Sequence, residues 1–449
     1  MTLKKKIIIV GGVGGGATVA AQIRRSDKES EIHIFEKGDH VSFSNCGMPY
    51  YLGGVLESRE DILYPTTEFQ KDFSMQVHTD TEVTHINREQ KQISFRRGDS
   101  SEKETTSYDK LILSPGAYAL CPEINGMVDD RTFTLHTIPD MDAIDQFIEK
   151  YKPTTAAVVG AGFVGLEMVE NLHARGITCT VIDRGDQVAK LVDKDMAEHV
   201  FSHLKEKNVA VKLNDGLSSF SNEGKKLHLE SGETVDADLT ILAIGIRPNT
   251  KLAVDSSLKI GNTGAITVNR YMQTSDPDIY ALGDVTETSD SITDSARNVA
   301  LAWPAHRQAY IIASHLNGEN IAYEGTMGTG ILKVFDLTVG STGHTTTSLK
   351  KAGYTFKEAS LQANSNASYY PGSDKLWIKV LFEEETGTIY SGQVVGYAGV
   401  DKRLAVLATA IKGKLTVADL QELELGYAPP FSSSKDPLNI LGYKAGAML

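Results

Sequence analysis

The stretch IIIVGGVGGG, residues 7–16, decides the fold of this chain, because a short β-branched apolar run passes directly into glycines. Such a run is typical of a strand that is buried on both faces in a parallel sheet. Residues 17–25 contain no helix breaker, and residues 31–36 alternate in polarity and end in Glu36. The stretch therefore predicts a strand, a glycine turn, a helix and a second strand, which is the βαβ unit that binds a dinucleotide.

The same pattern recurs in AAVVGAGFVG, residues 156–165, which a helical stretch and the run TVID at 180–183 follow. In a GxGxxG loop the first glycine makes the turn, the second lets the backbone approach a diphosphate, and the third packs the helix against the strand. The second loop fits this motif fully, with Gly160, Gly162 and Gly165. Two such units predict two bound dinucleotides.

The first loop admits two alignments, and it consists of Gly11, Gly12, Val13, Gly14, Gly15 and Gly16. Counting from Gly11 places Val13 where the middle glycine belongs. Counting from Gly12 instead gives GxGxxA, which ends at Ala17. For either loop the alternative is a glycine turn without a ligand, and the acids that follow both loops argue against it.

Two acidic residues end the second strands of the two units. Glu36 and Asp183 are placed to bind the ribose hydroxyls of an adenine dinucleotide. Asp183 would repel a 2′-phosphate, which favours NADH as the second nucleotide. Arg184 follows immediately, and its guanidinium could hold a 2′-phosphate, so NADPH remains the alternative.

Strand-like runs that end in small residues mark where the chain could cross between domains, at 111–117 and 239–245. We expect an α/β protein with two Rossmann-like dinucleotide-binding domains, the second inserted in the first, and an α+β C-terminal domain. The expected boundaries are 1–118 with 250–325 for the first domain, 119–249 for the second and 326–449 for the third.

Composition argues against several classes of protein. A net charge of −13 is unfavourable for nucleic acid or an anionic membrane as the main partner. No stretch approaches the roughly 18 apolar residues of a membrane helix. The three cysteines, Cys46, Cys121 and Cys179, are too few and too scattered for a disulfide framework or a four-ligand zinc site, so we expect no metal and a reducing cytoplasm.

Cys46 is the candidate reactive residue, in the segment SFSNCGMPYY at 42–51. Ser44 and Asn45 are good N-cap residues, which would place Cys46 in the first turn of a helix and lower the pKa of its thiol. No second cysteine is near enough for a CxxxxC dithiol. The partner of Cys46 is therefore an external thiol in a mixed disulfide, or an oxygen in a sulfenic acid.

The segment around Cys46 resembles the active-site segment of the coenzyme A-disulfide reductases. These enzymes are a single-cysteine branch of the FAD-dependent pyridine nucleotide-disulfide oxidoreductases. Matching segments cover essentially the whole chain, among them 23–25, 110–117, 302–303, 306–307, 369–372 and 427–430. The resemblance implies a homodimer that uses FAD and NADPH or NADH to reduce coenzyme A (CoA) disulfide to two CoA thiols through a Cys46–S–S–CoA mixed disulfide.

The resemblance also implies where CoA binds. Thr18, Gln22 and Arg25 are spaced i, i+4 and i+7, so they share one face of the first helix, the face that carries the CoA contacts in this family. Arg24 and Arg25 would supply positive charge for the phosphates. Lys71 lies two positions early relative to the basic contact of the family. The further CoA contacts that the resemblance implies are Ser42, Asn45, Lys71, Arg307 and Lys435.

Three more residues receive roles from the resemblance. Asp284 matches the aspartate that binds the ribityl chain of the flavin. Tyr369 and Tyr427 match tyrosines that reach from the C-terminal domain of one subunit to the cysteine of the other. A phenol beside a sulfur can donate a hydrogen bond or a proton to a leaving thiolate.

Three other functions remain as alternatives. An NADH peroxidase or oxidase would cycle Cys46 through a sulfenic acid, but those relatives carry a histidine in the first glycine loop, and residues 11–16 contain none. A persulfide or polysulfide reductase often has an appended rhodanese domain, for which 449 residues leave no room. The third alternative is a flavoprotein that signals by its redox state without turnover.

Overall fold

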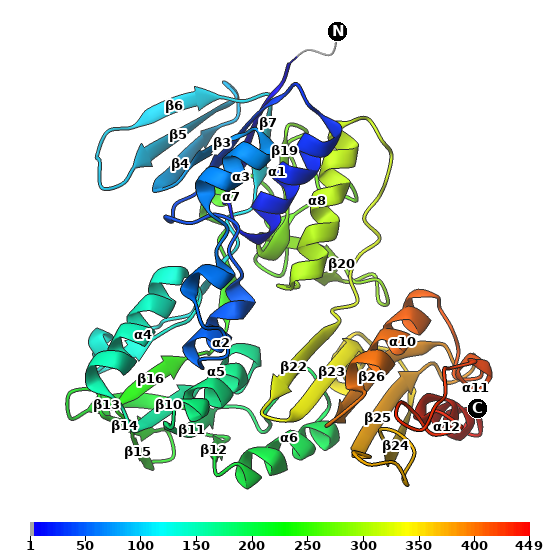
Figure 1. Ribbon diagram of the computed structural model, residues 1–449. Helices are drawn as coiled ribbons and strands as arrows, with labels where there is room; N and C mark the ends of the chain where they lie inside the picture. Colours follow the sequence, from blue (N-terminus) through cyan, green and yellow to red (C-terminus); the bar gives the residue numbers. More distant parts are fainter. Residues whose placement is uncertain (1–3) are drawn as a thin grey trace.

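The first glycine loop follows the central strand of a parallel five-stranded sheet in the computed structural model, which describes residues 4–449 (Figure 1). All four strand pairings in this sheet are parallel. Residues 7–10 are buried, as their β-branched apolar side chains predict. In order across the sheet, the strands are β19 (Ile279–Ala281), β7 (Lys110–Leu113), β1 (Lys6–Val10), β2 (Glu31–Phe35) and β3 (Gln76–His78).

Different layers cover the two faces of this sheet, because successive side chains of a strand point to opposite sides. Ile7 and Ile9 pack in a core with residues of the helices. Ile8 and Val10 pack in a second core with a small antiparallel sheet. The helices are α1 (Gly14–Ser26), α3 (Thr66–Phe73) and α8 (Ala302–Leu316), and the small sheet consists of β4 (Thr81–Asn87), β5 (Gln92–Arg97) and β6 (Glu104–Ser107).

The second glycine loop follows the central strand of a second parallel sheet, which repeats the first arrangement. This sheet consists of β12 (Ala210–Leu213), β11 (Thr178–Asp183), β10 (Thr155–Val159), β16 (Leu239–Leu242) and β9 (Thr132–Phe133). Its helices are α4 (Ile138–Tyr151), α5 (Phe163–Ala174) and α6 (Lys194–Glu206). An antiparallel sheet of β13 (Leu217–Ser221), β14 (Lys226–Leu229) and β15 (Thr234–Asp236) accompanies them.

The C-terminal part is a five-stranded antiparallel sheet with helices packed on it. Its strands are β22 (Gly330–Val334), β23 (Leu337–Gly343), β26 (Ile389–Gly396), β25 (Lys375–Phe382) and β24 (Lys357–Asn364). Its helices are α9 (Thr346–Lys351), α10 (Val400–Lys412), α11 (Asp419–Glu422) and α12 (Pro437–Gly446). Among residues 4–449 no helix is both long and apolar enough to cross a membrane, and the longest, α8, has 15 residues.

The chain leaves the first sheet and returns to it through a two-stranded ribbon. In this ribbon β8 (Ala117–Ala119) pairs antiparallel with β17 (Ile246–Pro248), and β19 then rejoins the first sheet. The predicted fold class, with one Rossmann-like domain inserted in another, is confirmed, and the exact domain boundaries stay a prediction. The remaining short elements are η1 (Asn45–Gly47), α2 (Met48–Leu52), η2 (Arg59–Ile62), η3 (Asp129–Arg131), α7 (Lys251–Asp255), β18 (Ile266–Thr267), η4 (Gly283–Val285), β20 (Thr286–Ser289) and β21 (Ala296–Arg297).

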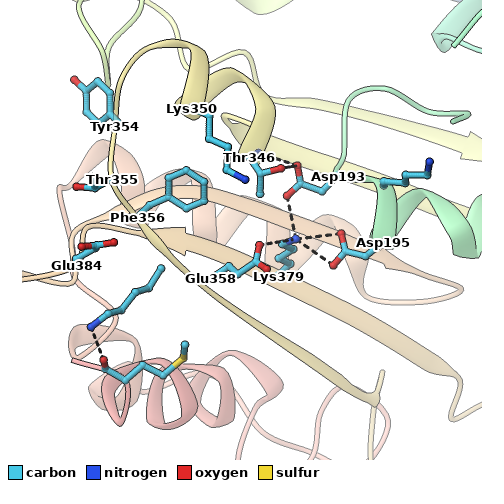
Figure 2. A pocket seen from close by; sticks show the side chains of 13 residues that line it. Asp193, Asp195, Thr346, Lys350, Tyr354, Thr355, Phe356, Glu358, Lys379 and Glu384 are labelled. Carbon is cyan, nitrogen blue, oxygen red and sulfur yellow. Dashed lines mark hydrogen bonds and ion pairs between the residues drawn. The ribbon is translucent and has the colours of Figure 1, made fainter. Parts of the chain in front are cut away.

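A buried lysine joins the second Rossmann-like part to the C-terminal sheet (Figure 2). The side chain of Lys379 in β25 is only 5% exposed, and its Nζ lies 3.2 Å from Asp193 and 3.1 Å from Asp195, both at the start of α6. Glu358 of β24 accepts from the same Nζ at 3.0 Å. Because a buried charge is costly unless it is paired, this cluster fixes how the two parts meet.

Candidate active site

The two glycine loops share the same backbone features, and these decide how the first loop is aligned. Gly11 and Gly160 have φ angles of +95° and +109°, a region that favours glycine. A Cβ on Gly16 would collide with the carbonyl oxygen of Gly11, and a Cβ on Gly165 would collide with that of Gly160. Gly11 and Gly16 are therefore the first and third glycines of the motif, and the alignment that ends at Ala17 is excluded.

The middle position of each loop caps the following helix. Val13 and Gly162 are the N-cap residues of α1 and α5, with φ angles of −99° and −86°. These are extended values that any residue adopts, which is why valine is tolerated in the first loop. A Cβ built on Gly14 or Gly162 would meet nothing within 4 Å. This open space at two helix N-termini fits the diphosphate groups of two dinucleotides.

The acids behind the two loops make equivalent contacts. Glu36 Oε2 accepts a hydrogen bond from the Gly12 amide at 2.6 Å, and Asp183 Oδ2 accepts one from the Ala161 amide at 2.8 Å. Burial raises the pKa of the Glu36 carboxyl. Both carboxylates thus lie against the glycine loops, at the position where a ribose would lie next to the diphosphate.

Asp183 also has a basic partner that the sequence analysis missed. Lys190 Nζ lies 2.8 Å from Asp183 Oδ1. Burial would raise the pKa of Asp183, but hydrogen bonds from Lys190 and from the amides of Ala161 and Gly185 outweigh it and hold the pKa below its ordinary value. Arg184 instead pairs with Glu230 at 2.6 Å on the surface, where ion pairs are weak. Lys190 is therefore the cation in contact with Asp183, and Arg184 is paired elsewhere.

Cys46 lies at the centre of η1, a single three-residue 3₁₀ turn that precedes α2. The predicted position in the first turn of a helix is therefore only approximately right, and Ser44 makes no side-chain cap. The predicted lowering of the thiol pKa is wrong for the protein chain. The side chain is exposed, yet the surrounding protein and the carboxylates of Glu167 and Asp284 raise the pKa of Cys46, and one short turn supplies too little dipole to oppose them.

Glu167 is a second residue that the sequence analysis missed. It lies in α5, which packs against α2, the helix that follows the η1 turn of Cys46. Burial and the neighbouring Glu170 raise the pKa of the half-buried Glu167 to about 7. Its position two residues after Gly165 was the available signal in the sequence. Glu167, with a pKa of about 7, thus lies in the helix that follows the second dinucleotide loop, and its charge acts on the Cys46 thiol.

Replacing Glu167 by glutamine is expected to lower the pKa of the Cys46 thiol, because the variant removes a negative charge that opposes the thiolate. The effect should be largest above pH about 7, where the Glu167 carboxyl is ionised. The measurement is the pH dependence of Cys46 alkylation by iodoacetamide in reduced protein. Glu198→Gln, on the exposed surface of α6, is the control. A midpoint that stays in place or rises would contradict this assignment.

Four of the predicted CoA contacts gather where α1 and α8 pack side by side. Thr18, Gln22 and Arg25 lie on one face of α1, with Thr18 and Gln22 half-buried and Arg25 exposed. Thr18 Oγ1 lies 2.9 Å from His306 Nδ1 of α8. The next residue, Arg307, lies over the ring of Tyr310 at 4.9 Å. Arg25 and Arg307 therefore place two positive charges on these two neighbouring helices, as an anionic ligand requires.

Arg24 does not add to that positive charge, and the expectation that it supplies charge to CoA is wrong. Its side chain is buried and turned to the other side of α1. There the guanidinium donates to four backbone carbonyl groups, those of Asp27, Ser30, Phe73 and Ser74. Arg24 therefore ties α1 to the end of α3.

The remaining predicted CoA contacts fall in two places. The Ser42 amide donates to the Gly12 carbonyl at 3.0 Å, and Asn45 Nδ2 donates to the His136 carbonyl at 3.2 Å. The first bond joins the segment around Cys46 to the first glycine loop, and the second joins it to the chain just before α4. Lys71 is exposed in the last turn of α3.

Asp284 lies close enough to Cys46 for its carboxylate charge to raise the pKa of the thiol. Asp284 lies in η4, directly after β19, and burial raises the pKa of its carboxyl. In the described chain its carboxylate oxygens accept no hydrogen bond, whereas its backbone carbonyl accepts one from Asn298. A half-buried carboxylate with free acceptor positions fits the hydroxyl groups of a ribityl chain.

The predicted tyrosines lie together in the C-terminal part. The hydroxyl oxygens of Tyr369 and Tyr427 are 3.5 Å apart, and the side chains are 74% and 50% exposed. Lys435, which is also exposed, lies with its Nζ 4.8 Å from the ring of Tyr443. Within residues 4–449 neither tyrosine hydrogen-bonds to Cys46. In Figure 1 the helices α11 and α12, between which Tyr427 lies, are on the far side of the molecule from α2.

Comparisons with known proteins agree with this geometry. Residues 5–309 match the model of the pyridine nucleotide-disulphide oxidoreductases, and residues 330–437 match their dimerisation domain. The chain is 41% identical over 443 residues to coenzyme A disulfide reductase of Staphylococcus haemolyticus, covering 98% of this chain and 99% of that protein.

Two solved structures are similar over nearly the whole chain. The crystal structure of reduced Bacillus anthracis CoADR-RHD is 44% identical with a TM-score of 0.97, covering 99% of this chain and 80% of that chain. The NAD-dependent persulfide reductase from A. fulgidus is 33% identical with a TM-score of 0.95, covering 98% of this chain and 83% of that chain.

Proposed function

Because the chain belongs to the pyridine nucleotide-disulphide oxidoreductases, we propose that it reduces CoA disulfide to two CoA thiols with electrons from NAD(P)H, using FAD and the single Cys46. One observation carries the proposal. The segment of Cys46 is joined to the first dinucleotide loop by the bond from the Ser42 amide to the Gly12 carbonyl, and Cys46 forms no disulfide with Cys121 or Cys179. An external thiol must therefore complete the disulfide.

FAD and NAD(P)H are the cofactors of this family, and the two glycine loops fit them. The residues proposed to hold FAD are Gly11, Gly12, Gly14, Gly15, Gly16, Glu36 and Asp284. Those proposed to hold NAD(P)H are Gly160, Gly162, Gly165, Asp183, Arg184 and Lys190. FAD held by these residues would supply the two-electron chemistry that links NAD(P)H to a disulfide at Cys46.

The reaction at Cys46 has two steps, formation of the mixed disulfide and its reduction. The Cys46 thiolate attacks one sulfur of CoA disulfide, which forms the Cys46–S–S–CoA bond, breaks the S–S bond of the substrate and releases one CoA thiolate. Two-electron reduction of that mixed disulfide returns the Cys46 thiolate and releases the second CoA thiolate. The hydride donor and one proton thus yield two CoA thiols from each disulfide. Arg25, Arg307 and Lys71 are proposed to bind the phosphates on this chain of net charge −13.

The dimerisation domain indicates a homodimer, and we propose that each active site is built from two chains. Tyr369 and Tyr427 are largely exposed, and in residues 4–449 their one side-chain hydrogen bond is to each other, not to Cys46. A two-fold axis through the C-terminal sheets would bring both phenols, with Lys435, to the cysteine of the partner subunit. There a phenol can protonate the leaving CoA thiolate.

The mass of the intact protein tests the function directly. We expect protein as isolated to lose the mass of one CoA moiety on treatment with reductant, and the purified enzyme to consume NAD(P)H when CoA disulfide is added. Unchanged mass together with no consumption would overturn the proposal. Consumption with hydrogen peroxide or oxygen alone would instead indicate a peroxidase or oxidase.

A persulfide reductase is the second candidate, because the persulfide reductase from A. fulgidus is similar over 98% of this chain. CoA persulfide and CoA disulfide both present a CoA moiety joined through an S–S bond, so the same basic residues and the same thiol fit both. The ratio of kcat/KM for CoA disulfide to kcat/KM for CoA persulfide distinguishes them. We expect this ratio to favour the disulfide.

Replacing Asp183 by alanine is expected to shift nucleotide preference toward NADPH by about tenfold, as the ratio of kcat/KM values. The variant removes repulsion of the 2′-phosphate and frees Lys190, which lies 2.8 Å from the carboxylate, to bind that phosphate. Lys190→Met should move the preference the opposite way. Steady-state kinetics with NADPH and NADH measure both variants, and a shift of Asp183→Ala toward NADH would remove Asp183 from this role.

A further inference from the structure

Arg403 is a buried charge that the proposed reaction does not use. It lies in α10 and is only 1% exposed. Its guanidinium Nη2 donates to Asp436 Oδ2 at 2.9 Å and to the Ser365 carbonyl at 3.0 Å. Nη1 donates to the Gly399 carbonyl at 3.1 Å. A planar fork with several donors therefore binds acceptors on separate parts of the chain.

Two of those acceptors belong to the segments that carry the tyrosines. The Tyr369 segment, residues 365–370, begins at Ser365, and the Tyr427 segment, residues 427–436, ends at Asp436. Neither segment is helix or strand, so no regular hydrogen-bond ladder holds it. Arg403 therefore binds the start of the Tyr369 segment, at Ser365, and the end of the Tyr427 segment, at Asp436.

Further bonds make the two segments one unit around Arg403. Ser432 Oγ donates to Asp436 Oδ2 at 2.7 Å, which closes the Tyr427 segment on itself. The Ala367 amide donates to the Pro429 carbonyl at 3.2 Å and joins the two segments directly. Because both phenols project into solvent, these segments determine where the hydroxyl groups of Tyr369 and Tyr427 lie.

We propose that Arg403 is a positioning residue for catalysis, which holds the Tyr369 and Tyr427 segments so that the two phenols meet the partner subunit's cysteine as a pair. This inference rests on the role proposed above for the tyrosines. A buried ion pair contributes little net stability relative to apolar residues of the same volume. What the guanidinium of Arg403 provides is the geometry of its planar donors, because the single ammonium group of a lysine could not reach the same acceptors.

The test is a double-mutant cycle on the dimeric holoenzyme. Arg403→Lys keeps the charge and is expected to lower kcat with CoA disulfide on the order of tenfold, with the KM for NAD(P)H unchanged. In a Tyr369→Phe/Tyr427→Phe background the same change should lower kcat less than about twofold, because the groups it positions are gone. Equal losses in both backgrounds would overturn the proposal.

Arg88→Lys is the matched control. Arg88 also pairs with an aspartate, the half-buried Asp276, at 2.8 Å and donates to two backbone carbonyls, but it lies in the first domain. It should leave kcat within about twofold of the parent. Should Arg403→Lys fail to fold, Ser432→Ala removes the 2.7 Å bond to Asp436 and the 3.5 Å bond from Arg403 Nη2, but keeps the Arg403–Asp436 pair. It should show the same dependence on the tyrosine background, with a smaller loss.

Fluorine NMR of protein that contains fluorotyrosine separates this inference from the proposed function. We expect Arg403→Lys to shift the resonances of Tyr369 and Tyr427, assigned through the phenylalanine variants, while Arg88→Lys leaves them in place. Shifted resonances with parental turnover in the tyrosine variants would show that Arg403 positions the pair and that the tyrosines are not catalytic. Unshifted resonances would overturn the positioning role itself.

Discussion

Cys46→Ser should retain bound FAD and lose turnover of CoA disulfide by on the order of a thousandfold or more. A serine hydroxyl is not ionised at neutral pH and cannot form the mixed disulfide, so both halves of the reaction lose their sulfur. The proposed flavin contacts, residues 11–16 with Glu36 and Asp284, are unchanged in the variant. The measurements are NAD(P)H consumption with CoA disulfide and the flavin absorbance per subunit.

Cys121→Ser is the matched control for this variant, because Cys121 is also exposed but lies outside the glycine loops and the segment around Cys46. It should turn over CoA disulfide at the parental rate. Parental turnover by Cys46→Ser would exclude Cys46 as the nucleophile. A variant that loses FAD as well as turnover would instead show that Cys46 supports the fold of the first loop.

Local pattern was enough to predict the two βαβ units, because each depends on residues close together in the chain. A buried β-branched strand, a glycine whose φ is positive and a third glycine under a helix are all properties of stretches of about ten residues. Even so, the sequence left the alignment of the first loop open. Only the collision of a Cβ on Gly16 with the Gly11 carbonyl decides it.

Side-chain environment was harder to predict, as Arg24 and Arg25 show. Adjacent residues on a helix point about 100° apart, so one of the two must leave the CoA face. Which one is buried depends on the end of α3, some 50 residues further along the chain, whose carbonyls accept from Arg24. The periodicity of α1 alone could not supply that information.

The prediction of a lowered pKa for the Cys46 thiol was wrong for a related reason. The N-cap residues beside it are local, whereas the groups that oppose the thiolate come from α5 and from the turn after β19. Glu167 and Asp284 are separated from Cys46 by more than a hundred residues and reach it only in the folded chain. Lys190 was missed in the same way, since no motif links it to Asp183.

Mixed dimers are expected to recover about half of the parental activity from two defective chains, if each site combines Cys46 of one chain with Tyr369 and Tyr427 of the other. One parent carries Cys46→Ser and is inactive. The other carries Tyr369→Phe/Tyr427→Phe and is slowed, since each phenol removed costs a hydrogen bond or proton donor worth about 1–3 kcal/mol. In the mixed dimer one site collects both defects and the other site is intact.

The outcome differs if the tyrosines act within their own chain. Both sites of the mixed dimer then remain defective, one without its thiol and one without its phenols, and activity cannot exceed half of that of the tyrosine variant. Co-expression with two affinity tags and purification on both yields the mixed dimer. A dimer of Cys46→Ser with a parental chain gives half activity under either arrangement and calibrates the scale. Recovery to that level requires that each active site combine residues of both chains. We propose this arrangement because the tyrosine pair, with hydroxyl oxygens 3.5 Å apart, is exposed and makes no hydrogen bond to its own Cys46 in the described chain.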